Sequence, residues 1–144
     1  MKKTFLIIAI LSLTIAGCND EKKQTDSVLN NNWEKEIKLD DNEAKWEANI
    51  ETTKGVEDLQ NLIKTNTTTT VEEYVALAEK LNERKNILVK EFTMEGPSHD
   101  NLHIFLYPLI GKINLLLEVT STEKASEIMS SISDNLTAYN TYFK

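Results

Sequence analysis

The sequence predicts an all-α domain, a four-helix bundle that follows a disordered tether. Apolar residues recur at helical spacing along most of the chain beyond residue 33, which is the main sequence signal of amphipathic helices. The 144 residues include only four Gly and two Pro, too few turn formers for a β sandwich. No repeat of fixed period is present, which argues against a solenoid. We therefore expect one domain with one modest core.

The first 17 residues have the layout of a secretory signal peptide. Two lysines precede an apolar stretch over residues 4–16. This stretch is shorter than the roughly 20 residues that a membrane-spanning helix needs. It ends in the sequence Ile15-Ala16-Gly17-Cys18.

An aliphatic residue, two small residues and a cysteine, in this order, resemble the signal sequences of bacterial lipoproteins. The resemblance implies attachment of a diacylglycerol to Cys18, cleavage before this residue and acylation of the new amino group. Two or three acyl chains, at about 0.8 kcal/mol per buried methylene, would anchor the protein stably. The alternative is that Cys18 is an ordinary cysteine of an uncleaved membrane anchor, which the short apolar stretch and the small residues disfavour.

The residue after the cysteine bears on which membrane holds the protein. In the enterobacterial pattern, a residue other than Asp at this place permits transfer to the outer membrane. The sequence has Asn19 there and Asp20 one place later. We expect the periplasmic face of the outer membrane, or the outer surface of the cell membrane in a bacterium with a single membrane.

Cleavage before Cys18 would leave a strongly acidic chain. The full sequence has 16 basic and 23 acidic residues, and loss of Lys2 and Lys3 leaves 14 basic residues, a formal charge of −9. Such a chain is repelled by nucleic acid and by anionic lipid surfaces, so we exclude nucleic acid as a partner. Because Cys18 is the only cysteine, the chain forms no internal disulfide.

Residues 18–32 are predicted to be a lipidated flexible tether, because the run is polar and only Val28 and Leu29 could be buried. Residues 33–144 would form the helical domain, with residues 33–39 as a short helical lead-in. We expect the first long helix at about residues 42–64. Gly55 lies within its apolar stripe and predicts a kink or break, because Gly costs about 1 kcal/mol relative to Ala inside a helix.

Three further helices complete the predicted bundle. The second, residues 71–92, begins at the capping box of Thr70 and Glu73. The third, residues 100–119, is apolar on most faces, so we expect it at the centre of the bundle, surrounded by the other three. Pro108 should bend or split this helix, and Lys112, Asn114 and Glu118 argue against a second membrane span. The fourth carries an apolar stripe from Ala125 to Phe143 and would begin at a capping box of Thr120 and Glu123.

His99 and His103 are four residues apart, a spacing at which two imidazoles share a helix face and bind a divalent metal. We expect the helix to begin only at Asp100, however, with this residue as the N-cap. His99 would then precede the first turn, and a polar loop is the favoured interpretation, with a metal site as the alternative. Because these are the only histidines, a haem or a metal centre with ligands on several helices is not expected, and no cofactor is predicted.

A serine next to a histidine and two aromatic residues are further candidates for a functional role. Ser98 adjoins His99, but no Gly-x-Ser-x-Gly motif surrounds it, so no catalytic residue is predicted and we do not expect an enzyme. Trp33 and Tyr142 fall off the apolar stripes and are candidates for exposed interface residues, although packing in the core or incidental exposure is the favoured interpretation of each.

These expectations favour a membrane-anchored periplasmic lipoprotein that binds another envelope protein without catalysis. An assembly helper, an exclusion factor and an immunity protein all belong to this class. The interpretation is reached by elimination, because no motif of the mature chain specifies a partner. The alternative is a helical bundle that binds a small ligand or a metal.

Overall fold

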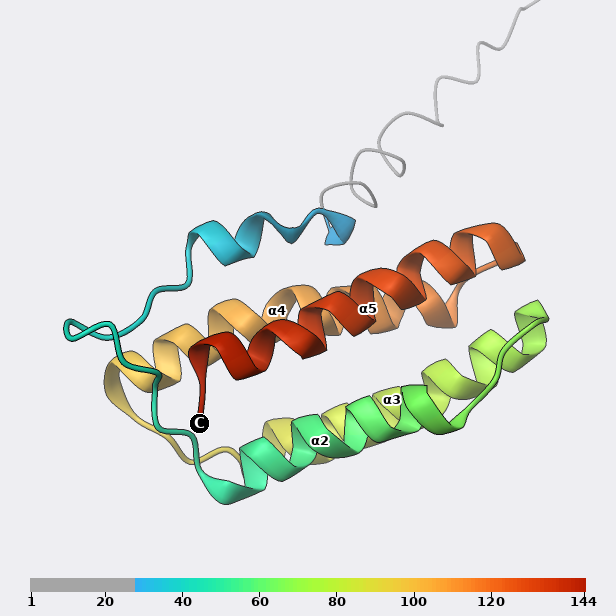
Figure 1. Ribbon diagram of the computed structural model, residues 1–144. Coiled ribbons are helices and arrows are strands. Elements are labelled where there is room, and N and C mark those ends of the chain that lie inside the picture. The colour runs from blue at the N-terminus through green and yellow to red at the C-terminus, as the bar shows by residue number, and fades with distance from the viewer. Residues whose placement is uncertain (1–27) are drawn as a thin grey trace, which may run out of the picture.

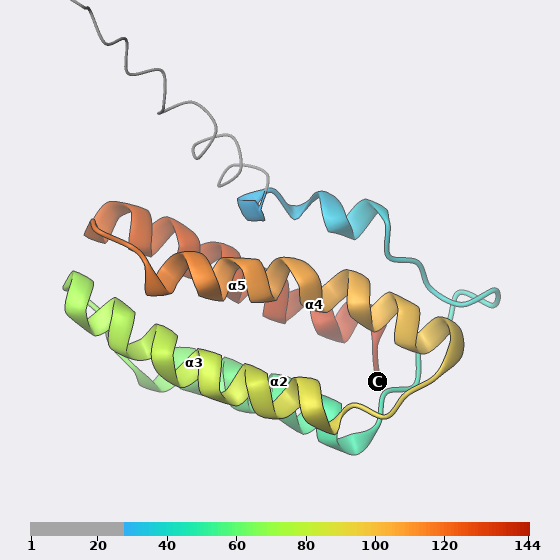
Figure 2. The same cartoon turned by 180° about the vertical axis from the view of Figure 1, so that it is seen from behind.

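The computed structural model describes residues 28–144, in which a short 3-10 helix, η1 (Asn31–Lys35), precedes four α-helices. Figure 1 shows two layers, with α2 beside α3 and α4 beside α5, and Figure 2 shows the same layers from behind. The predicted all-α class with four packed helices is confirmed. Within the described residues, no helix is long and apolar enough to cross a membrane. The helices are α2 (Ile50–Thr65), α3 (Val71–Glu91), α4 (Gly96–Leu117) and α5 (Thr122–Tyr142).

One hydrophobic core lies between the two layers and receives side chains from all four helices. The residues that occupy it recur at helical spacing, so each helix turns one apolar stripe inward. Burial of apolar area, at roughly 25 cal/mol per Å², is the main term that holds the layers together. The fully buried positions include Leu59, Leu81, Leu88, Leu102, Phe105, Leu109, Ile113, Leu116, Ile132 and Leu136.

The helix α2 begins later than the sequence predicts, because the residues before it pair with the end of the chain. The backbone of Trp46 donates to the carbonyl of Tyr142 over 2.8 Å and accepts from the amide of Lys144 over 3.0 Å, which forms an isolated parallel bridge. Residues that give their backbone groups to this pairing are not helical. The helix therefore starts at Ile50 and not near residue 42.

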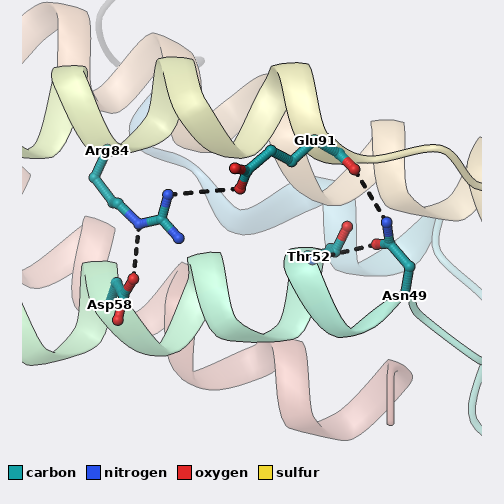
Figure 3. Close-up of polar contacts among 5 residues, drawn as sticks. All are labelled: Asn49, Thr52, Asp58, Arg84 and Glu91. Carbon is teal, nitrogen blue, oxygen red and sulfur yellow. Dashed lines mark hydrogen bonds and ion pairs between the residues drawn. The ribbon is translucent and has the colours of Figure 1, made fainter.

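Asn49 marks this start and also connects α2 to α3. Its side-chain oxygen accepts from the amide of Thr52 over 3.2 Å, and its amide group donates to the carbonyl of Glu91 over 3.1 Å (Figure 3). About two turns further along the layer, Arg84 Nε lies 2.9 Å from a carboxylate oxygen of Asp58, and Arg84 also faces the Glu91 carboxylate at 3.8 Å. These contacts fix the register of α2 against α3.

The expected break at Gly55 does not occur, and α2 is continuous from Ile50 to Thr65. Gly55 is buried against the side chain of Leu88 on α3, so the missing side chain allows close packing of the two helices. The capping box of α3 is confirmed, because the Thr70 side chain accepts from the amide of Glu73 while the Glu73 carboxylate accepts from the amide of Thr70.

The helix α4 begins at Gly96, ahead of the expected start, and Asp100 is therefore not its N-cap. Pro97 lies in the first turn, where its missing N–H is not needed and its fixed φ suits a helix. The helix is also continuous through Pro108 and is not split there. It packs mainly against α3, α5 and η1. The prediction that the other three long helices surround it is therefore wrong in part, because η1 covers it where the first long helix was expected.

The predicted capping residue of α5 is wrong by one position. Ser121, and not Thr120, precedes the first helical residue, and its side chain accepts from the amide of Lys124. Both residues are hydroxyl-bearing, so the sequence pattern could not distinguish them. The helix then runs to Tyr142 with its apolar stripe turned inward.

Candidate functional site

The lipidation site expected from the sequence, Cys18, lies outside the described residues, as does most of the predicted tether. The described chain begins against the bundle. Val28 packs on α4, where its Cγ1 lies 3.0 Å from the place that a Cβ on Gly111 would occupy. The hydroxyl of Ser131 on α5 donates to the carbonyl of Leu29 over 3.1 Å. Packing of the N-terminal segment thus starts before Trp33, the predicted first residue of the domain.

Trp33 is not an exposed aromatic, so the interface candidate is wrong for this residue and the favoured alternative, packing in the core, is found instead. Only 7% of its surface is accessible, and its ring meets Phe105 edge-on at 5.8 Å and Tyr142 at 6.3 Å. Tyr142 is half-buried by this contact. Trp33 falls off the helical stripes because it belongs to η1, a separate short helix that packs on α4. Its burial therefore does not follow the apolar spacing of the four long helices. The two residues attach the N-terminal segment to the domain.

A buried lysine lies under this N-terminal segment, between α4 and α5. Lys112 is fully buried, and its ammonium donates to the carbonyl of Ser131 and to the side-chain oxygen of Asn135, each over 3.1 Å. Asn135 in turn donates to the carbonyl of Phe105 over 3.3 Å. Burial lowers the pKa of Lys112 from 10.5 to about 8, against the opposing effect of Asp134 and Glu34. The cluster ties α4 to α5 through a charge held inside the protein.

The burial of Lys112 was not predicted from the sequence, although its position along the helix indicates it. Lys112 lies three residues after Leu109 and four before Leu116, both fully buried, and so falls on the inward stripe of its helix. A lysine on such a stripe is either a snorkelling side chain or a buried charge with partners. The partner that decides the case, Asn135, lies on another helix and could not be read from local spacing.

The structure brings the two histidines together, contrary to the expectation that His99 precedes the helix. Both residues lie within α4, one turn apart, and their Nε2 atoms are 2.9 Å from each other. The pair is half-buried, with the ring of Phe92 packed against both imidazoles and the ring of Tyr107 against His103. Ser98 does not approach His99 as a nucleophile would, because its hydroxyl donates to the carbonyl of Glu47 over 2.7 Å.

A pocket of about 180 Å³ lies between α2 and α5, away from the histidines. Gln60 lines this pocket, and its side-chain amide donates to the carbonyl of Leu136 over 2.9 Å. Most of the side chains around it are polar, which differs from the largely apolar lining of typical small-molecule sites. The lining residues are Gln60, Ile63, Lys64, Ser133, Leu136, Thr137 and Asn140.

The class that the fold defines is an all-α four-helix bundle with an N-terminal segment packed on its α4–α5 layer. The sequence matches no protein-family model, and neither curated proteins nor solved structures gave a match.

Proposed function

We propose that the protein is a lipid-anchored, non-catalytic binding module of the bacterial cell envelope whose partner is another envelope protein. The lipoprotein-like sequence that ends at Cys18 supports the anchor. The high acidic charge of the chain disfavours nucleic acid and anionic lipid as the bound surface. A protein partner is the class that remains.

The observation that carries the proposal is the short connection between the anchor and the bundle. Val28 contacts α4 ten residues after Cys18. Ten residues span at most about 33–36 Å when fully extended, which is close to the length of α3 at about 1.5 Å per residue. A domain tied at this distance stays within about its own length of the membrane, so a membrane protein or another anchored protein is within its reach.

Outward-facing apolar side chains mark positions from which a partner can be captured. Ile50 at the start of α2 is 77% exposed, Tyr107 on α4 is 66% exposed and Ile87 on α3 is 45% exposed. Replacing one of these residues by a photo-reactive amino acid leaves the core intact, since none of them is buried. The three positions lie on three different helices of the bundle.

The test is photo-cross-linking in the cells that make the protein, followed by mass spectrometry. We expect one envelope protein to be captured repeatedly from one of the three positions. A Cys18→Ser variant should lose membrane fractionation and with it the cross-link, while its domain stays folded. A variant that fractionates and cross-links like the original would contradict the anchor, and capture of no protein from all three positions would contradict the binding function.

A further inference from the structure

The His99–His103 pair is organised as a hydrogen-bonded unit on α4. The ring centroids are 4.4 Å apart, the ring planes meet at 75°, and the Nε2 atoms are 2.9 Å apart. The Nδ1 atom of His99 is buried and has no hydrogen-bond partner among the described residues. One Nε2 atom donates to the other, and the direction depends on the tautomers of the two rings.

Aromatic side chains hold both imidazoles in place. The ring of Phe92, just beyond the end of α3, lies 5.5 Å from His99 and 5.4 Å from His103. Tyr107, one turn further along α4, covers the other side of His103 at 5.2 Å. Because the rings are held before a ligand arrives, little conformational entropy is lost when they bind one. This arrangement is favourable for a chelate.

We propose that His99 and His103 bind a divalent transition-metal ion through their Nε2 atoms, with Cu²⁺ as the preferred ion. Metal–imidazole bonds are about 2.0–2.1 Å long. Two such bonds to one ion place the nitrogens about 2.9 Å apart at a right angle and about 3.3 Å apart at a tetrahedral angle. The Nε2 atoms of the metal-free, hydrogen-bonded pair already lie 2.9 Å apart, so one ion can be reached by both. Cu²⁺ is the preferred ion because it leads the affinity order of the divalent first-row ions.

The rest of the coordination shell would come from outside the chain. Residues 28–144 contain no group of three or more His, Cys, Asp or Glu side chains that could hold a metal. Water or a group of another molecule therefore fills the remaining positions, and the ion is exchangeable. Coordination through Nε2 requires the proton of His99 to be on Nδ1, which has no described acceptor, and a missing outer partner of this kind weakens a site.

The metal site is independent of the proposed binding function, and its test needs no partner. The full chain is purified in detergent, stripped of metal with a chelator and titrated with Cu²⁺ and separately with Zn²⁺. We expect one Cu²⁺ per chain, tighter binding of Cu²⁺ than of Zn²⁺, and an electron paramagnetic resonance spectrum with splitting from two nitrogens. His99→Gln and His103→Gln should each weaken Cu²⁺ binding at least about tenfold, since a direct ligand matters at least as much as an outer-shell partner, and should leave the signature of one nitrogen.

Two double variants keep the number of histidines constant, one by moving the pair along the helix at the same spacing and the other by changing the spacing. His99→Gln with Tyr107→His moves the pair one turn along the same face and should retain two-nitrogen binding. His103→Gln with Asp100→His places the two imidazoles on neighbouring residues that do not face each other, and should bind as weakly as a single variant. Equal Cu²⁺ affinity in all variants, or Zn²⁺ binding as tight as Cu²⁺, would overturn the proposal.

Discussion

Gly55 on α2 lies directly against Leu88 on α3, so closely that a Cβ on Gly55 would be 2.7 Å from Leu88 Cδ1 and 3.2 Å from Leu88 Cβ. Leu88 is fully buried and is packed on its other sides by the core. The glycine that predicted a weak point in the helix is therefore a point of close contact between the two helices. Its value lies in the absent methyl group and not in backbone flexibility.

We expect Gly55→Ala to destabilise the protein, although alanine is the better helix former. Overpacking costs about 1–3 kcal/mol, and the gain in helix propensity returns about 1 kcal/mol, which leaves a net loss of about 1 kcal/mol in the free energy of unfolding. Urea denaturation measures this loss. In a Leu88→Ala background the 2.7 Å contact with Cδ1 is gone and only the 3.2 Å contact with Cβ remains, so the same substitution should cost less. An equal loss in both backgrounds would show that Leu88 is not the cause.

Asn49 should contribute to stability through two separable hydrogen bonds. Asn49→Ala removes the cap on Thr52 and the bond to the Glu91 carbonyl, and we expect a loss of about 1–2 kcal/mol in unfolding free energy. Asn49→Ser keeps a capping oxygen and removes the donor to Glu91, so it should cost about half as much. If both variants unfold at the same urea concentration, the cap does not contribute as proposed.

The buried Lys112 makes stability depend on pH in alkaline solution. Its pKa is about 8 in the folded protein and 10.5 as the ordinary value, so the unfolded chain holds the proton more tightly. Stability should therefore rise with pH through this window, by about 2 kcal/mol between about pH 7 and about pH 9.5. Lys112→Met has no such group, and its stability curve should lack this rise. Urea denaturation at a series of pH values gives the free energy of unfolding of both proteins. If the two plots of this free energy against pH run parallel, the shifted pKa is contradicted.

Loss of side-chain volume at fully buried positions of the apolar stripes should lower the stability of the protein. Ile132 is fully buried, and Ile132→Ala should lower the free energy of unfolding by about 2–5 kcal/mol. Leu116→Ala, at another fully buried position, should do the same. Ile87→Ala removes the same atoms from a side chain that is 45% exposed and serves as the matched control. Thermal melting that does not separate Ile132→Ala from Ile87→Ala would contradict this core.

The prediction of the candidate sites from sequence was less complete than that of the fold. The spacing of His99 and His103 identified a possible metal pair, but the expected helix start at Asp100 argued against it. Pro97 lies in the first turn of α4. Proline is accepted both just after the end of one helix and in the first turn of the next. The choice between them depends on how α4 packs against α3 and is not encoded in the local pattern.

The sequence by itself determined the features that depend on neighbours along the chain. The capping box of Thr70 and Glu73 and the apolar stripe of α5 are local patterns, and each was read correctly because the helix is formed by residues three and four apart. Tertiary structure decided the rest: Trp46 pairs with the chain end, Trp33 is buried against Phe105, and Lys112 is enclosed with Asn135. Each of these outcomes depends on a residue far away in sequence, because burial and hydrogen bonding are satisfied in space.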